Sequence, residues 1–284
     1  PDSRDIFNAN VTMQYGLDDI RGYDSIIPLN YVDYMRETTP QVQLDFNRIS
    51  PVFTNDAFYS WHPQTDYVQV LDSSLLSLLN VRYIVTYPDV LIPFNDWDTV
   101  CCDSTVVIYE NPLAVPRAFT VAHADMTLPT ELVDYSEGET VFDIPEYTQA
   151  DIIRDTAREK FLSIDISGDT WLVISENYSQ GWKAFIRPEG AGDDNEFQLN
   201  VVPVANILQG VEINRDEIAL HFADSELSDQ AQTALTQGRF TVRMVYSPTS
   251  VQVGFFGSAI SAIVLTLLVG IWLWTIFVGT NTAE

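Results

Sequence analysis

Basic residues are scarce in this chain of 284 residues. Lys and Arg together number 14, against 40 Asp and Glu, so the formal net charge at pH 7 is −26. Lys160 and Lys183 are the only lysines. Nucleic acid and anionic lipid surfaces repel so negative a chain, and its overall charge argues against both as partners. An acidic, lysine-poor surface suits a high-salt or cation-rich exterior, and it equally suits an ordinary solvated acidic face.

Cysteine and histidine are also rare. The two cysteines, Cys101 and Cys102, are adjacent. A bridge between neighbouring residues is strained, so we expect two thiols and no disulfide framework that would identify the compartment. The histidines His62, His123 and His221 lie far apart and lack the ligand spacing of a zinc site. The sequence therefore predicts no metal site and no cofactor.

Two acidic stretches could supply oxygen ligands to calcium. Neither has the ordered spacing of a dedicated calcium loop, and exposed acidic turns explain both equally well. No G-x-S-x-G elbow surrounds any serine, so no catalytic residue is assigned. The stretches comprise Asn95, Asp96, Asp98 and Asp103 in the first, and Asp193, Asp194 and Glu196 in the second.

One long apolar run lies near the C-terminus. Residues 253–278 contain no ionisable group, and about 20 apolar residues suffice for a helix to cross a bilayer. Tyr246 precedes the run and Trp272 and Trp274 lie near its other end, where aromatic rings favour the headgroup level. We therefore expect one transmembrane helix within residues 247–284. No Lys or Arg follows it, so the charge of the tail does not determine its orientation.

Small residues recur along one face of this expected helix. Gly254, Ser258 and Ala262 are spaced by four residues, with Gly257 and Ser261 beside them. Small residues at this spacing allow another helix to approach closely in lipid, although Gly and Ala are also simply common in membrane helices. If the face packs, its partners are helices of integral membrane proteins within the lipid bilayer.

Residues 1–122 predict an α/β and loop-rich region. A helix capped by Asp72 is expected to run to Asn80. The segment from Tyr15 to Tyr67 has little periodicity, and we expect packing on other structure to order it. Three strands are expected, at residues 82–87, 105–109 and 118–122.

Residues 123–246 predict an antiparallel β-sandwich, because short alternating strands recur at regular intervals. Two of these strands, 171–175 and 182–186, are expected to pair around residues 179–181. The fold class is therefore mainly β, with a sandwich beside a small α/β region and one C-terminal transmembrane helix. Since the last strand ends at Tyr246, we expect the sandwich to stand directly on that helix. The remaining strands are expected at 161–166, 197–202, 208–213, 218–222 and 239–246, with a helical insertion at 224–236.

A few arginines and tryptophans stand out singly. Arg82 and Arg117 lie on or beside strands among many acids, which favours ion pairs with nearby Asp or Glu. Trp182 is expected to anchor the sandwich core after a tight turn at Gly181. Large aromatic side chains are usually buried in the core. Stacking on a sugar ring is the alternative role for Trp61, Trp97, Trp171 and Trp182.

Five segments resemble one known family. LLSLLNVRYIVT, YENPLAVPRAF, ENYSQGWKAFI and VYSPTSVQVG, at residues 75–86, 109–119, 176–186 and 245–254, resemble the C-terminal exterior region of YfhO-type bacterial membrane proteins. YGLDDIRGYDSI at 15–26 fits the start of that region. The family is similar to C-type glycosyltransferases, which use polyprenyl-phosphate sugars on cell-envelope glycans. The resemblance implies an exterior domain followed by a final membrane helix.

Two departures from the family limit what the resemblance implies. A polar loop at residues 187–195 replaces a short turn, and the upstream helices and the loop that would bear a catalytic carboxylate are not in this sequence. Pro1 is followed by neither a basic nor an apolar signal region, which predicts a processed or truncated C-terminal part of a longer protein. A cytoplasmic domain inserted by its tail is the rival interpretation.

Two functions remain open. The first is a non-catalytic exterior module, anchored in the cell membrane by a single pass, that mediates protein or glycan contacts as an accessory subunit of a larger complex. The second is the C-terminal part of a polyprenyl-phosphate-sugar-dependent glycosyltransferase whose catalytic spans lie upstream.

Overall fold

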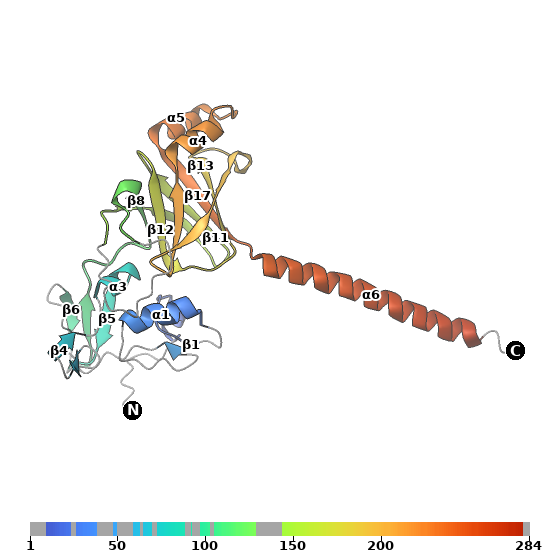
Figure 1. Cartoon of the computed structure of the whole chain (residues 1–284), viewed down its shortest axis with the longest axis horizontal. Coiled ribbons are helices and arrows are strands. Elements are labelled where there is room, and N and C mark those ends of the chain that lie inside the picture. Colours follow the sequence, from blue (N-terminus) through green and yellow to red (C-terminus); the bar gives the residue numbers. More distant parts are fainter. Residues whose placement is uncertain are drawn as a thin grey trace.

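A computed structural model gives the fold of this chain (Figure 1). Most elements are antiparallel strands, and one long apolar helix ends the chain, which confirms the predicted fold class. The structure describes residues 10–23, 27–38, 48–49, 59–62, 65–69, 73–88, 92, 97–102, 105–128 and 144–280.

Two five-stranded sheets form the sandwich. The outer sheet has the order β10-β11-β17-β13-β14, and the inner sheet has the order β15-β16-β12-β8-β9. The outer strands are β10 (Asp151–Asp155), β11 (Glu159–Asp165), β13 (Trp182–Pro188), β14 (Phe197–Leu199) and β17 (Arg239–Tyr246). The inner strands are β8 (Ala118–Ala122), β9 (Thr148–Gln149), β12 (Thr170–Asn177), β15 (Val201–Val204) and β16 (Leu208–Ile213).

The inner sheet is covered on both faces. Leu172 and Ile174 of β12 share a core with Leu162 of the outer sheet. On the other face, Trp171 and Val173 share a second core with residues of the N-terminal region. The first six residues of β12 are therefore all buried, whereas burial alternates along β11. Alternation is expected of a strand with one solvated face.

The N-terminal region packs on the inner sheet through short elements. Tyr34 Oη of α1 (Leu29–Thr38) donates to the carbonyl of Leu75 in α3 (Ser73–Leu78) at 2.8 Å. Ser175 Oγ of β12 donates to the last carbonyl of α3, that of Leu78, at 2.7 Å. The region also contains a three-stranded sheet of β5 (Tyr83–Thr86), β7 (Val107–Glu110) and β6 (Asp98–Cys102). Two strand pairs belong to it as well, β1 (Gly22–Tyr23) with β2 (Arg48–Ile49) and β3 (Tyr59–His62) with β4 (Thr65–Gln69).

Several expected elements differ from those observed. The segment predicted as a strand at 218–222 belongs to a helix, α4 (Arg215–Phe222), because the Asn214 side chain caps it by accepting from the Glu217 N–H at 2.9 Å. The expected pairing of β12 with β13 is wrong, since the two strands lie in different sheets. The expected strand at 118–122 is β8, and it pairs with β12 and thus belongs to the sandwich. The helical insertion is observed as α5 (Asp229–Gln237).

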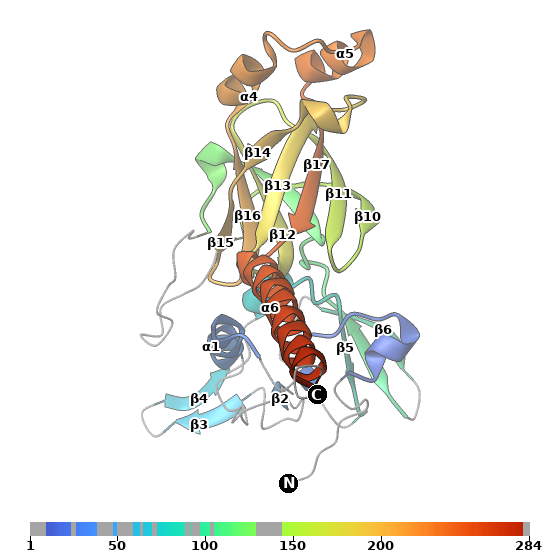
Figure 2. The ribbon, with the colours of Figure 1, turned by 90° about the vertical axis from the view of Figure 1, so that its right-hand side faces the viewer.

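The last strand leads into the C-terminal helix without a separate linker. The N–H of Tyr246, the last residue of β17, donates to the carbonyl of Arg158 at 2.9 Å. The N–H of the next residue, Ser247, donates to the carbonyl of Gly181 at 2.8 Å. Helix α6 (Thr249–Thr280) then leaves the end of the sandwich, on the side of the outer sheet (Figure 2). Its Thr249–Ile276 part is long and apolar enough to cross a membrane, and the described remainder of the chain buries none of it.

The Ser175 hydrogen bond predicts how firmly the N-terminal region is held. In Ser175→Ala, the buried carbonyl of Leu78 loses its side-chain donor, and we expect the free energy of unfolding to fall by about 1–3 kcal/mol. Chemical denaturation of the full chain in detergent would measure this. Ser225→Ala removes a hydroxyl whose bond is long, 3.4 Å, and exposed, and it should change the free energy much less. Equal losses in the two variants would contradict the prediction.

Candidate functional site

A charge cluster lies at the end of the sandwich from which α6 emerges. Lys160 Nζ lies 2.7 Å from Glu176 Oε1 and also contacts Asp155. Arg117 Nη2 binds the same Glu176 oxygen at 2.6 Å. We call Arg117, Asp155, Lys160 and Glu176 the junction cluster. It joins β10, β11, the end of β12 and the residue before β8, whose charges meet at the same end of the sandwich.

Lys160 is the unusual member of the junction cluster. It occupies an inward position of β11, two residues before Leu162, and only 6 % of its side chain is exposed. Its amine also lies 5.6 Å from the centre of the Trp182 ring, which favours a cation. A charge at such a position requires paired carboxylates, since a buried unpaired charge is very costly.

Opposite charges engage each member of the junction cluster. Lys160 has two acidic partners and Glu176 has two basic ones. Arg117 also lies 3.7 Å from the exposed Asp18 of the N-terminal region. The arrangement therefore holds strand ends together and presents no unpaired nucleophile or base among its own groups.

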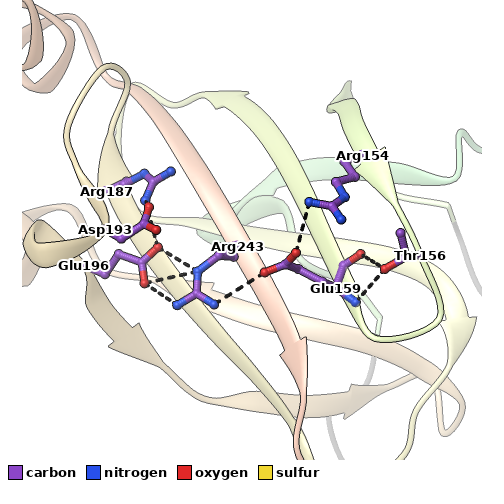
Figure 3. A network of polar contacts seen from close by, with 7 residues as sticks. All are labelled: Arg154, Thr156, Glu159, Arg187, Asp193, Glu196 and Arg243. Carbon is purple, nitrogen blue, oxygen red and sulfur yellow. Dashed lines mark hydrogen bonds and ion pairs between the residues drawn. The ribbon is translucent and has the colours of Figure 1, made fainter.

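A second charge network lies on the exposed face of the outer sheet (Figure 3). Arg243 binds Glu196 through two nitrogens, at 2.9 and 2.5 Å, and lies 3.8 Å from Glu159. The hydrogen bond to Glu196 raises the pKa of the Arg243 guanidinium above its usual value. Arg187 contacts both Asp193 and Glu196. Charges of alternating sign thus run from the segment before β14 across β13 and β17 to β11.

The candidate calcium ligands that the structure describes do not form a site. Asp193 and Glu196 bind arginines in the network described above, so their oxygens are already engaged. Asp98 is exposed on β6, and Asn95, Asp96 and Asp103 lie outside the described residues, as does the expected cap Asp72. In the described part of the chain, no three His, Cys, Asp or Glu side chains come together as a metal site would require. Cys101 is a free, exposed thiol.

The tryptophans proposed for sugar stacking have different surroundings. Trp97 is only 7 % exposed and shares a small core with Leu76 and Ile84, so its ring offers no open face to a sugar. Trp171 is equally buried. Trp182 is half-buried, beside Tyr246 at 5.3 Å between ring centres. The side chain of Trp61 lies outside what the structure describes.

The expected ion pairs of the two arginines are confirmed. Arg82 Nη2 lies 3.0 Å from Glu110, and Arg117 binds Glu176 as described above. The structure adds the ion pairs of Lys160, which the sequence did not predict. Its partner Glu176 is 16 residues away, but a lysine at an inward position of an alternating strand is a signal that could have identified it.

The small-residue face of α6 is open. A side-chain carbon built on Gly254 or Gly257 would meet nothing within 4 Å. The Ser261 hydroxyl donates to the Gly257 carbonyl of its own helix at 2.8 Å, which satisfies it in an apolar environment. Ser258 and Ala262 are exposed on the same helix.

Comparison with known proteins adds no relative: no family model, curated protein or solved structure matches the chain.

The junction cluster predicts that removal of one carboxylate charge will strongly lower the free energy of unfolding. Glu176→Gln leaves the buried Lys160 with Asp155 as its remaining acidic partner, and we expect the free energy of unfolding to fall by about 3 kcal/mol. Glu189→Gln provides the control, because Glu189 and its partner Arg239 are 42 % and 43 % exposed and such pairs contribute less than about 1 kcal/mol. Denaturation curves of both variants would decide. Similar losses would mean that the junction cluster is no stronger than a surface pair.

Proposed function

We propose that this chain is a non-catalytic module, anchored in the cell membrane by α6, whose sandwich lies on the exterior side and contacts membrane proteins, or a glycan, at the membrane surface. The observation that carries the proposal is the direct passage from β17, the central strand of the outer sheet, into an apolar helix that the described chain leaves uncovered. A helix anchored in this way holds the sandwich at the bilayer.

The close packing at the junction supports a fixed rather than a loose anchor. Gly181 has φ of +119°, and a side-chain carbon there would lie 2.8 Å from Pro248 Cα. The turn before β13 therefore packs directly against the chain between β17 and α6. A module held in this way presents the same faces to the membrane and to its neighbours, which suits a subunit that positions partners.

The open small-residue face supports helix contacts within the bilayer. In lipid, helices associate through close packing rather than through the hydrophobic effect, and small residues permit the closest approach. Gly254 and Gly257 leave that space free. We therefore assign the face formed by Gly254, Gly257, Ser258, Ser261 and Ala262 to a helix of another membrane protein.

The glycosyltransferase interpretation is the second candidate, and it rests on the five segments that resemble the YfhO type. In the structure these segments contact one another: Asn111 donates to Ser77 Oγ at 2.9 Å, Arg117 binds Glu176, and Trp182 lies beside Tyr246. Such contacts favour a packing role for the segments themselves, so catalysis would depend on spans encoded upstream. A gene with many spans before Pro1 would favour this candidate, and a short frame with a signal peptide would exclude it.

The helix face provides the test of the favoured function. Ser258→Leu fills the centre of the small-residue face, and we expect the recovery of membrane proteins cross-linked to the chain in native membranes to fall about tenfold, or ~1.4 kcal/mol. Quantitative mass spectrometry after purification in mild detergent would measure recovery.

A matched variant separates loss of the face from loss of the anchor. Ile263→Leu changes the opposite side of α6, given 3.6 residues per turn, and should leave recovery unchanged. Both variants should stay in the membrane pellet after alkaline extraction and should keep the unfolding curve of the original sandwich. Undiminished recovery with Ser258→Leu would refute docking through this face.

A further inference from the structure

Two exposed cations in this acidic chain have no acidic partner. Arg158 and Lys183 are both exposed, and neither forms an ion pair with a carboxylate of the described residues. Every other Lys or Arg whose side chain the structure describes binds a carboxylate or a carbonyl. Among the basic side chains that the structure describes, these two are therefore the exception.

Both cations lie at the base of α6. The carbonyl of Arg158 accepts the N–H of Tyr246 at 2.9 Å, and Lys183 pairs in register with Val245. They therefore flank the last two residues of β17, Lys183 from β13 and Arg158 from the turn just before β11, three to four residues before α6 begins at Thr249. The side chain of Lys183 is exposed on β13. Helix α6 emerges on the side of the outer sheet, to which β13 belongs (Figure 2).

Aromatic side chains accompany the two cations. Trp182 and Tyr246 are half-buried neighbours, with ring centres 5.3 Å apart. Aromatic rings next to a membrane span favour the headgroup level, and basic groups there can reach lipid phosphates. We call Arg158, Trp182, Lys183 and Tyr246 the basic rim.

The net charge of −26 for the whole chain does not determine the electrostatic potential at the basic rim. Exposed charges farther away than about 10 Å are largely screened at physiological salt. Three acids at the neighbouring strand ends are already bound, Glu159 by Arg154, and Asp155 and Glu176 by Lys160. The local surface is therefore basic, although the chain as a whole is acidic.

We propose that Arg158 and Lys183 bind the phosphate groups of anionic lipid headgroups and so seat the sandwich on the bilayer surface. The proposal rests on the membrane anchoring proposed above and specifies which surface of the module meets the lipid. It reverses, for this one surface, the expectation that the net charge excludes anionic lipid. Arg supplies a planar fork of donors and Lys a compact charge, and both bind phosphate oxygens well.

The scarcity of lysine makes a direct test possible. The full chain would be placed in nanodiscs of phosphatidylcholine alone or of equimolar phosphatidylcholine and phosphatidylglycerol, and exposed to an uncharged amine-acetylating reagent. Mass spectrometry would follow Lys183, with the buried Lys160 as an internal reference. We expect phosphatidylglycerol to slow acetylation of Lys183 about fivefold, the effect of one basic group near an anionic surface, and to leave Lys160 unchanged.

Two variants make the test specific to the basic rim. Arg239→Lys retains the charge and introduces a reporter amine at the opposite end of β17, and its acetylation should be the same in both nanodiscs. Arg158→Gln removes the other cation of the basic rim and its attraction for anionic headgroups, and it should reduce the protection of Lys183 to about twofold. Equal protection of the two reporter amines, or full protection in Arg158→Gln, would overturn the proposal.

Further controls distinguish lipid phosphate from free phosphate, and failure of the basic rim from failure of the membrane anchor. Inorganic phosphate added to the phosphatidylcholine nanodiscs should leave Lys183 reactive, and protection equal to that of phosphatidylglycerol would instead indicate a site for free phosphate. Failure of the chain to co-elute with nanodiscs would contradict the proposed membrane anchoring. Co-elution with Lys183 equally reactive in both lipids would contradict the basic rim alone.

Discussion

The structure depends on one continuous piece of chain, β17 and the helix α6 that follows it. β17 lies at the centre of the outer sheet between β11 and β13, and hydrogen bonds from Tyr246 and Ser247 extend its pairing until α6 is about to begin. The chain is therefore held to the sheet as far as Ser247, two residues before α6 begins. The proposed position of the sandwich at the bilayer, the proposed role of the helix face and the placement of the basic rim all depend on this attachment.

Burial on both faces explains how the rest of the chain is held to this anchor. The inner sheet packs against the outer sheet on one face and against α1 and α3 on the other. At the α6 end, Lys160 and Arg117 meet at Glu176 and tie both sheets together. The same acids are thereby neutralised beside the anchor, which leaves the exposed Lys183 and Arg158 to dominate the local field. A strongly acidic protein can in this way present a basic surface to a membrane.

Local patterns in the sequence predicted much of the fold. The apolar run, the strands β8, β11 and β17 and the helical insertion were all recognisable, because alternation and uncharged length are local signals. The pairing of the strands could not be recognised in the same way. Ser167–Asp169 and Ser179–Gly181 look like hairpin turns, yet each connects a strand of one sheet to a strand of the other. Residues 218–222 read as a strand until the Asn214 cap is considered. The junction cluster was missed because its charges meet only after the sheets have formed.

Hydrogen–deuterium exchange of the full chain in nanodiscs tests the central claim most directly. If β17 continues into α6, the amides of Tyr246 and Ser247 should exchange nearly as slowly as those of Val242 and Met244 inside the strand, because their N–H groups are bonded to Arg158 and Gly181. Exchange of Tyr246 and Ser247 at the rate of an unstructured chain, with the strand and the helix still protected, would reveal a flexible tether and contradict the account.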